Sequence, residues 1–255
     1  MQKAVVDRLL SINREFYQSF AEPFRATRGR LQPGVDHALE SVDLAANTLD
    51  LGCAHGLLAE SLMKRGFTGR YVGLDASQSL LDEVSDQLQP PQFRFGLADL
   101  SEPDWPESAG ALYSKGMVME VGDSSPTSLF DWVFAFAVLH HMPTGELRRS
   151  IAASIGTLLH AEAQVAVSVW DFLASPRLQD RIVPWGTVDL SEQDVDKGDY
   201  LVDWREGGSG MRYVHHFTSD ELTDLAREVG FRVTEEYRTD GENSRLGLYQ
   251  FWAKA

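Results

Sequence analysis

The stretch TLDLGCAHG, residues 48–56, decides the fold, because it reads as a buried strand that runs into a glycine-rich turn. A helix-like segment, GLLAESLMKRG, follows at 56–66, and Gly66 marks its end. A strand that ends in glycines and opens a helix presents backbone N–H groups to a ligand. In open parallel sheets, ligands bind in the crevice at this position.

Strand-like and helix-like segments alternate along the next part of the chain. Strands are predicted at 70–77, 93–100, within 128–139 and at 163–171, and helices are predicted at 78–88 and 145–160. This alternation implies a parallel sheet with helices on both faces. The tail, residues 231–255, reads as two strands joined by a loop that contains glycine, so a hairpin is expected to end the sheet.

The remaining segments suggest how one domain, residues 1–255, is divided. A helix is predicted over 3–24, ended or bent by Pro23, and a second helix over 35–45. The long connection 101–128 is expected to hold a small hairpin, ALYSKGMVMEVG, at 111–122. We therefore expect an N-terminal helical lid (1–45), a cofactor-binding core (46–170), a substrate-side insertion (171–215), and a terminal helix and hairpin (216–255).

Composition narrows the classes of protein. Hydrophobic residues make up 43% of the chain, enough for a sizeable core, and the net charge of −15 repels polyanions on average. A single cysteine, Cys53, excludes an internal disulfide framework. No apolar run is long enough to span a membrane and the first residues lack a signal-peptide pattern, so a cytoplasmic protein is expected.

The turn pattern Asp50-x-Gly52-x-Ala54-x-Gly56 differs from the dinucleotide fingerprint G-x-G-x-x-G in its spacing and in its leading acid. A pyrophosphate beside Asp50 would be repelled, whereas an ammonium group would be attracted, so the pattern favours a cation-bearing nucleoside. Alanine at position 54 is expected to be tolerated unless the turn requires a positive φ. His55 is expected to point to solvent or to the neighbouring helix, without a catalytic role.

Two further acids follow the next two predicted strands. Asp75 is placed to accept hydrogen bonds from both ribose hydroxyls, and Asp99 to accept one from an adenine amino group. Three acids at three successive strand ends, together with the glycine turn, resemble the class I S-adenosylmethionine methyltransferases. The resemblance implies a Rossmann-like seven-stranded sheet in the order 3-2-1-4-5-7-6 with an antiparallel last strand. The cofactor-binding residues that it implies are Asp50, Gly52, Ala54, Gly56, Asp75, Ala76, Asp99, Leu100, Phe136 and Ala137.

More specific motifs resemble the tRNA wobble-uridine methyltransferases, which esterify a 5-carboxymethyl group. These motifs are ATR (26–28), FDWVFAFAVLHHMP (130–143), VSVW (167–170), GDYLVDW (198–204) and RYVHHFTSDEL (212–222). The chain departs from that family where Val-Pro-Trp is typical and Val202-Asp203-Trp204 stands instead. The resemblance implies tRNA as acceptor and a small activating partner protein. The acidic net charge opposes unaided binding of tRNA, and such a partner could supply the binding surface.

Candidate catalytic residues follow from the same motifs. Arg28 and Arg212 match family positions and can bind a carboxylate through two N–H groups, and Arg245 is a further candidate by position. His141 follows the fourth predicted strand and can orient the acceptor or act as a base. Tyr17, Phe20 and Trp170 are candidates to line the pocket. The His140-His141 and His215-His216 pairs lack metal-site spacing, so no metal is predicted.

Bland alternatives stay open for these side chains. Arg28 can belong to a solvated turn, Arg212 can pair with a nearby acid, and His141 can be a structural polar group at a helix entry. Two other functions also stay open. One is a small-molecule O- or N-methyltransferase, in which acidity is no obstacle and residues 1–45 cover the cofactor. The other is a protein that binds S-adenosylmethionine without catalysis.

Overall fold

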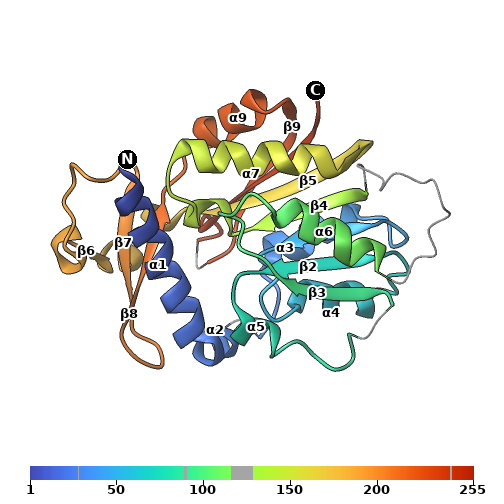
Figure 1. Ribbon diagram of the computed structural model, residues 1–255, viewed down its shortest axis with the longest axis horizontal. Coiled ribbons are helices and arrows are strands. Elements are labelled where there is room, and N and C mark those ends of the chain that lie inside the picture. The colour runs from blue at the N-terminus through green and yellow to red at the C-terminus, as the bar shows by residue number, and fades with distance from the viewer. Residues whose placement is uncertain (28, 89–90, 116–128, 242) are drawn as a thin grey trace.

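A seven-stranded sheet forms the centre of the protein (Figure 1). The computed structural model describes residues 1–27, 29–88, 91–115, 129–241 and 243–255. The strands of this sheet are β1 (Thr48–Leu51), β2 (Tyr71–Asp75), β3 (Phe93–Leu97), β4 (Phe130–Phe136), β5 (Leu159–Trp170), β9 (Phe231–Thr239) and β10 (Gly247–Lys254). Their order is β3-β2-β1-β4-β5-β10-β9, and β10 runs antiparallel to both of its neighbours. The predicted class I fold is confirmed.

Helices cover both faces of this sheet. One face carries α3 (Pro33–Ala38) and α4 (Leu57–Lys64), and the other carries α6 (Trp105–Ser114), α7 (Gly145–Leu158) and α9 (Ser219–Glu228). The remaining helices are α1 (Lys3–Ser19), α2 (Ala21–Thr27), α5 (Gln78–Leu81) and α8 (Pro176–Gln179), with short 3₁₀ turns at Leu39–Ser41, Leu139–His141, Phe172–Ala174 and Trp185–Val188. No described helix has both the length and the apolar character that a membrane span requires.

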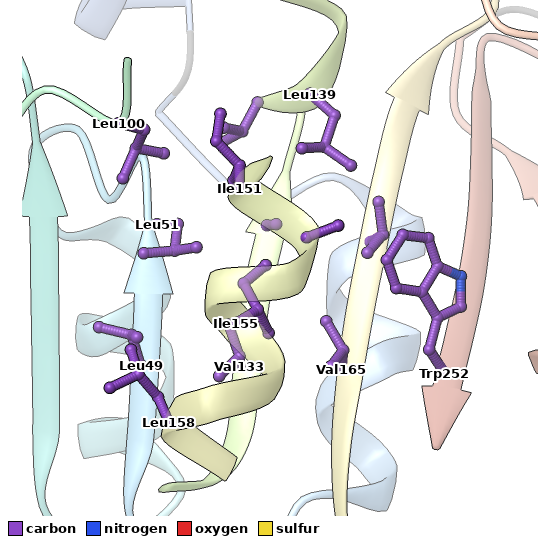
Figure 2. Packing of buried hydrophobic residues seen from close by; sticks show 14 of the residues in the cluster. Leu49, Leu51, Leu100, Val133, Leu139, Ile151, Ile155, Leu158, Val165 and Trp252 are labelled. Carbon is purple, nitrogen blue, oxygen red and sulfur yellow. The ribbon is translucent and has the colours of Figure 1, made fainter. Parts of the chain in front are cut away.

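The larger core lies between the sheet and α7. Leu49 and Leu51 of β1 point toward Ile151 and Ile155 of α7, with Val133 of β4 beside them (Figure 2). Each of these side chains is at most 1% exposed. Because burying one such side chain stabilises a protein by about 1.5–3 kcal/mol, this layer holds the strand ends in fixed positions.

A second sheet lies within the predicted insertion 171–215. It is antiparallel, in the order β6-β7-β8, and consists of β6 (Ile182–Val183), β7 (Asp199–Trp204) and β8 (Gly210–His215). Helix α1 lies alongside β7 and β8, although about 190 residues separate them in the chain (Figure 1). Leu9 and Ile12 of α1 pack against Leu201 of β7 and Tyr213 of β8. The N-terminal helix and the insertion therefore form one unit beside the carboxyl edge of the main sheet.

Some predicted elements differ from the structure. The hairpin expected at 111–122 is wrong in its first part, because 111–114 belong to α6; positions 116–122 lie outside the described residues. Trp105, Ala109 and Leu112 recur at helical spacing and pack on the core, so α6 forms instead. The first helix ends at Ser19, and Pro23 lies in the first turn of α2, where its missing N–H is not needed.

Candidate cofactor and acceptor site

The loop after β1 uses its own N–H groups within the protein. The N–H groups of Gly52 and Cys53 donate to the carbonyl oxygen of Leu74 at 2.8 and 3.0 Å. The N–H of Ala54 donates to Asp75 Oδ2 at 2.9 Å. These groups are therefore not directed at a ligand phosphate, which agrees with the phosphate-free nucleoside expected from the sequence.

Two alanines beside this loop have left-handed backbone conformations. Ala54 has a φ of +48° and Ala137, directly after β4, has a φ of +58°. The turn thus takes the conformation that favours glycine, which is the condition under which alanine at position 54 was expected to be unfavourable. Such a conformation costs roughly 1–2 kcal/mol per residue. Strained backbone of this kind gathers at functional sites.

Asp50 lies beneath the loop, on the face of β1 that meets α4. Its Oδ2 accepts a hydrogen bond from the Tyr71 hydroxyl at 2.6 Å, and the residue is 4% exposed. Burial raises the pKa of Asp50 to about 7, with a smaller contribution from the charge of Asp75, although the hydrogen bond from Tyr71 acts in the opposite direction. An acid in this state responds to pH near neutrality.

Asp75 is held at the end of β2 by two backbone donors. Ser77 N–H donates to Oδ1 at 2.8 Å and Ala54 N–H donates to Oδ2 at 2.9 Å. Burial raises the pKa of Asp75, and these N–H bonds act in the opposite direction. Each carboxylate oxygen has a second lone pair. The carboxylate can therefore accept ribose hydroxyls while the loop holds it in place.

Asp99, beyond β3, has partners on both oxygens. Oδ1 accepts from the N–H and hydroxyl of Ser101 at 2.9 and 2.6 Å, and Oδ2 is 3.2 Å from Arg14 Nε on α1. The ion pair with Arg14 joins the N-terminal helix α1 to the loop after β3, and we call the part of the site around Asp75 and Asp99 the cofactor half. The predicted contact of Asp99 with an adenine amino group stays a prediction.

A cavity of about 330 Å³ brings most of the predicted site residues together. It lies at the carboxyl edge of the main sheet, under α1. The predicted residues that line it are Gly52, Ala54, Asp75, Ala76, Asp99, Leu100, Phe136, Ala137, His141 and Arg212, together with Tyr17, His140 and Trp170. His55 is 8% exposed and also lines the cavity, so, of the two expected environments, solvent and the neighbouring helix, solvent is wrong.

Other candidates lie elsewhere. Asp50 and Gly56 are not among the lining residues of this cavity. Arg28 lies outside the described residues. Arg245 is exposed in the loop between β9 and β10, and Phe20 stacks on Phe16 at a centroid distance of 5.3 Å.

Arg212, one of the residues that line the cavity, is surrounded by aromatic rings. Its guanidinium carbon lies 5.0 Å from the ring centroid of Phe16 and 5.1 Å from those of Trp170 and Trp204. The residue is 6% exposed. Contacts of a cation with ring faces stabilise it by about 2 kcal/mol when water is excluded. The three rings restrict the orientation of the guanidinium, and Arg212 is one of the residues that line the cavity.

His141 connects the short turn Leu139–His141 to α1 and β8. Its Nδ1 is 3.1 Å from the Tyr213 carbonyl oxygen, which can only accept, so Nδ1 carries the proton in the neutral ring. Nε2 then accepts the Tyr17 hydroxyl at 2.8 Å. Asn13 N–H groups donate to the carbonyl oxygens of His141 and Tyr213 at 3.2 and 3.1 Å, and Asn13 Oδ1 accepts from Tyr213 N–H at 2.8 Å.

The other histidines have structural contacts. His140 Nδ1 accepts from the N–H of Trp170 at 3.2 Å. His215 lies between Asp199 and Glu221, and His216 contacts Asp171; neither histidine is among the cavity lining. Across the described part of the chain, no group of three or more His, Cys, Asp or Glu side chains is arranged for a metal ion.

Several lining residues were missed from the sequence. They are Asn13 and Arg14 from α1, and Asp240 and Tyr249 from the terminal hairpin. Asp240 accepts from Gly34 N–H at 2.9 Å and from the Tyr249 hydroxyl at 2.5 Å. Gly34 and Asp240 are 206 residues apart in the chain, so no local motif marks their contact. The φ of +69° at Asp240, in the hairpin loop, is a signal visible only in the structure.

Proteins of known sequence and structure are similar to this chain. A trans-aconitate 2-methyltransferase from Variovorax paradoxus (strain S110) is 27% identical over 220 residues, which cover 78% of this chain and 82% of that protein. A putative methyltransferase of Haloferax volcanii, solved with the Trm112 methyltransferase activator, has a TM-score of 0.63 at 14% identity and covers 94% of this chain and 96% of its own.

A third similar protein is 1,6-didemethyltoxoflavin-N1-methyltransferase from Burkholderia thailandensis, whose structure holds S-adenosylhomocysteine. Its TM-score is 0.58 at 17% identity, with 99% of this chain and 88% of that chain covered. The family model described as a methyltransferase domain matches residues 22–236. The chain therefore belongs to this methyltransferase family, as a class I enzyme that uses S-adenosylmethionine.

Proposed function

We propose that this methyltransferase transfers its methyl group to a carboxylate oxygen of the acceptor and forms a methyl ester. The observation that supports this most is the buried Arg212, which lines the same cavity as Gly52 and Asp75. A guanidinium matches a carboxylate in charge and in geometry. The similar protein from Variovorax carries the name of a carboxylate, trans-aconitate.

The reaction asks mainly for alignment. When bound, S-adenosylmethionine supplies an electrophilic methyl group on a sulfonium. A carboxylate is ionised at neutral pH and needs no base. Correct placement of the two reactants can lower the activation free energy by roughly 7–11 kcal/mol. In this proposal Arg212 holds the carboxylate, and the rings around it exclude water that would weaken the contact.

The pair of Tyr17 and His141 supports a second candidate, transfer to a hydroxyl or amine acceptor. His141 Nε2 accepts the Tyr17 hydroxyl at 2.8 Å, and both side chains line the cavity. A proton from such an acceptor could pass through the Tyr17 oxygen to Nε2. With a carboxylate acceptor, the pair would instead hold α1 over the site as a lid.

The finer prediction, 5-carboxymethyluridine in tRNA, belongs to the same proposal because that base carries a carboxylate. Its motifs include Arg212, and the Haloferax neighbour was solved with an activator protein, so a small partner is part of this version. The net charge of −15 weighs against unaided binding of tRNA.

Labelled S-adenosylmethionine tests the proposal. The purified protein is incubated with a panel of small carboxylic acids, a panel of small hydroxyl and amine compounds, or tRNA that carries 5-carboxymethyluridine. Label that mild base releases as methanol identifies a methyl ester. Base-stable label in the hydroxyl or amine compounds alone would contradict carboxylate methylation and support the second candidate.

Arg212 provides the matched variant. We expect Arg212→Ala to lower kcat/KM by roughly 10- to 100-fold, the effect of losing one hydrogen-bonded charge, while the Kd of S-adenosylhomocysteine stays unchanged. Arg205→Ala is the control, because the Arg205 side chain, directly after β7, is 62% exposed and pairs with Asp203. Equal activity of Arg212→Ala and the parent would contradict the role of Arg212.

A further inference from the structure

The charged residues of the cavity are unevenly distributed. Among the described lining residues, the arginines and lysines are Arg14 and Arg212, and the acids are Asp75, Asp99 and Asp240. Arg14 lies in the cofactor half, 3.2 Å from Asp99. We call the part of the cavity around Arg212 and Trp170 the acceptor half. Among the described residues that line it, Arg212 is the single arginine.

The position of Arg212 restricts what it can bind. Rings of Phe16, Trp170 and Trp204 lie about 5 Å from its guanidinium carbon, so a ligand approaches from the cavity and not from these sides. At 6% exposure, the group is reached through the cavity rather than from bulk water. This arrangement suits one carboxylate at the end of an acceptor that is enclosed by protein.

The rest of the acceptor half suits an uncharged body. The cavity lining includes the apolar side chains of Leu10, Met142, Val169, Trp170 and Leu246. An ionised group buried against such side chains without a partner loses its hydration at a cost of several kcal/mol.

Asp240 adds a negative charge to the same half. Its carboxylate is held by the Gly34 N–H and the Tyr249 hydroxyl, and it is 8% exposed. Burial and then the charge of Asp240 raise the pKa of Tyr249. A second carboxylate on the acceptor would lie in the same cavity as this charge, where repulsion is weakly screened.

We propose that the acceptor is a monocarboxylic acid with an uncharged, mainly apolar body, and that the site selects against di- and tricarboxylic acids. This inference rests on the proposed methylation of a carboxylate. In the step, a carboxylate oxygen forms the O–CH₃ bond as the S–CH₃ bond breaks, and the sulfur keeps the electron pair. The products are a neutral ester and a thioether, and no proton is transferred.

Three acids with six carbons and one trans double bond test this selection. They are trans-2-hexenoate, trans-2-hexenedioate and trans-aconitate, with one, two and three carboxylates. We expect kcat/KM to fall at least tenfold with each added carboxylate. Calorimetric Kd values for the same acids, measured with the enzyme loaded with S-adenosylhomocysteine, should rise in the same order.

Asp240→Asn tests the source of the selection. Asparagine tolerates the positive φ and keeps an oxygen for one of the two donors. We expect this variant to lower the ratio of kcat/KM for trans-2-hexenoate to kcat/KM for trans-2-hexenedioate at least threefold. The control Asp224→Asn changes a side chain that is 64% exposed on α9, and it should leave this ratio of kcat/KM values unchanged.

The outcomes separate the two proposals. Preference for trans-aconitate, by rate and by Kd, would overturn the monocarboxylate inference and leave carboxylate methylation in place. Base-labile label in tRNA, with no binding of the acids, would do the same. Base-stable label in hydroxyl or amine compounds only, with no binding of any acid, would overturn both.

Discussion

At the scale of single residues, Asp50 is an acid of the predicted cofactor motif that the fold buries. The sequence places this acid beside the cofactor, whereas the structure buries it under the loop with Tyr71 as its partner. Its pKa of about 7 means that the folded protein keeps a proton which the unfolded chain releases near pH 3.8. The free energy of unfolding therefore falls as pH rises from about 4 to about 7.

The first prediction concerns Asp50→Asn, which removes this ionisation and keeps an acceptor for Tyr71. We expect the variant to gain stability relative to the parent as pH rises from 5 to 8. The upper limit over this range is about 3 kcal/mol, from the roughly two pH units between pH 5 and the folded pKa of about 7 at 1.36 kcal/mol each. Urea unfolding of both proteins at pH 5 and pH 8 measures this; an equal difference at both values would show that Asp50 does not titrate in this range.

The second prediction concerns the strain at Ala54. Glycine adopts a φ of +48° without a steric penalty, so Ala54→Gly should raise the free energy of unfolding by about 1 kcal/mol. The control Ala153→Gly, at an exposed position of α7, should lower it by about 1 kcal/mol. Thermal melts of the two variants compare them directly, and destabilisation by both changes would argue against strain at position 54.

At the scale of elements, Asn13 shows how α1 is attached to the second sheet. β8 lies at an edge of that sheet, and the Asn13 side chain pairs with both the N–H and the C=O of Tyr213. The amide thereby takes the place of a neighbouring strand. Arg212 precedes Tyr213, so this pairing also fixes the position of the arginine.

The third prediction follows from this pairing. Asn13→Ala should raise KM for the carboxylate acceptor more than it lowers kcat, and it should lose roughly 1–3 kcal/mol of stability. Asn13→Asp keeps the acceptor for the Tyr213 N–H, so hydrogen exchange at that N–H should stay slow in this variant and become fast in Asn13→Ala. Ser11→Ala, on the outer side of α1, is the control. An unchanged KM in Asn13→Ala would leave the residue with a purely structural role.

At the scale of the whole molecule, a buried charge cluster joins the second sheet to the main domain. His215 Nδ1 is 2.7 Å from Asp199 Oδ1, and Nε2 is 2.8 Å from Glu221 Oε1 on α9. Burial alone would lower the pKa of His215, but the two carboxylate hydrogen bonds outweigh it and raise the pKa, against a smaller opposing effect of Arg148. Burial alone would raise the pKa of Glu221, but contacts with His215 and Arg148 lower it.

The fourth prediction gives the sign of the pH dependence. The contribution of charged His215 to the free energy of unfolding is complete below about pH 6.5. It is lost as pH rises through the raised pKa of His215. The Glu221 contribution is present above about pH 4.5 and is lost as pH falls through the lowered pKa. The stability difference between the parent and His215→Gln should therefore be largest between about pH 4.5 and 6.5. Urea unfolding from pH 4 to 9 measures it, with the exposed His160→Gln as control; a difference that is independent of pH would contradict the charged pair.

The sequence predicted the main sheet well because its signals are local. Leu49 and Leu51 alternate with Thr48 and Asp50, and such a pattern specifies a strand without knowledge of its neighbours. The first part of the hairpin expected at 111–122 is wrong because the helical spacing of Trp105, Ala109 and Leu112 extends α6 to Ser114. The length of α5 was also overestimated, since polar positions after Leu81 carry little information on where a helix ends.

By itself, the sequence determined the class of fold and the kind of cofactor, because strands, turns and strand-end acids are encoded in neighbouring residues. Only the tertiary structure decided the acceptor half. Arg212 reads the same whether it pairs on a surface or lies among aromatic rings, and its ring contacts come from Phe16, Trp170 and Trp204. Burial by distant segments sets the chemistry of that arginine, and the folded chain alone brings those segments together.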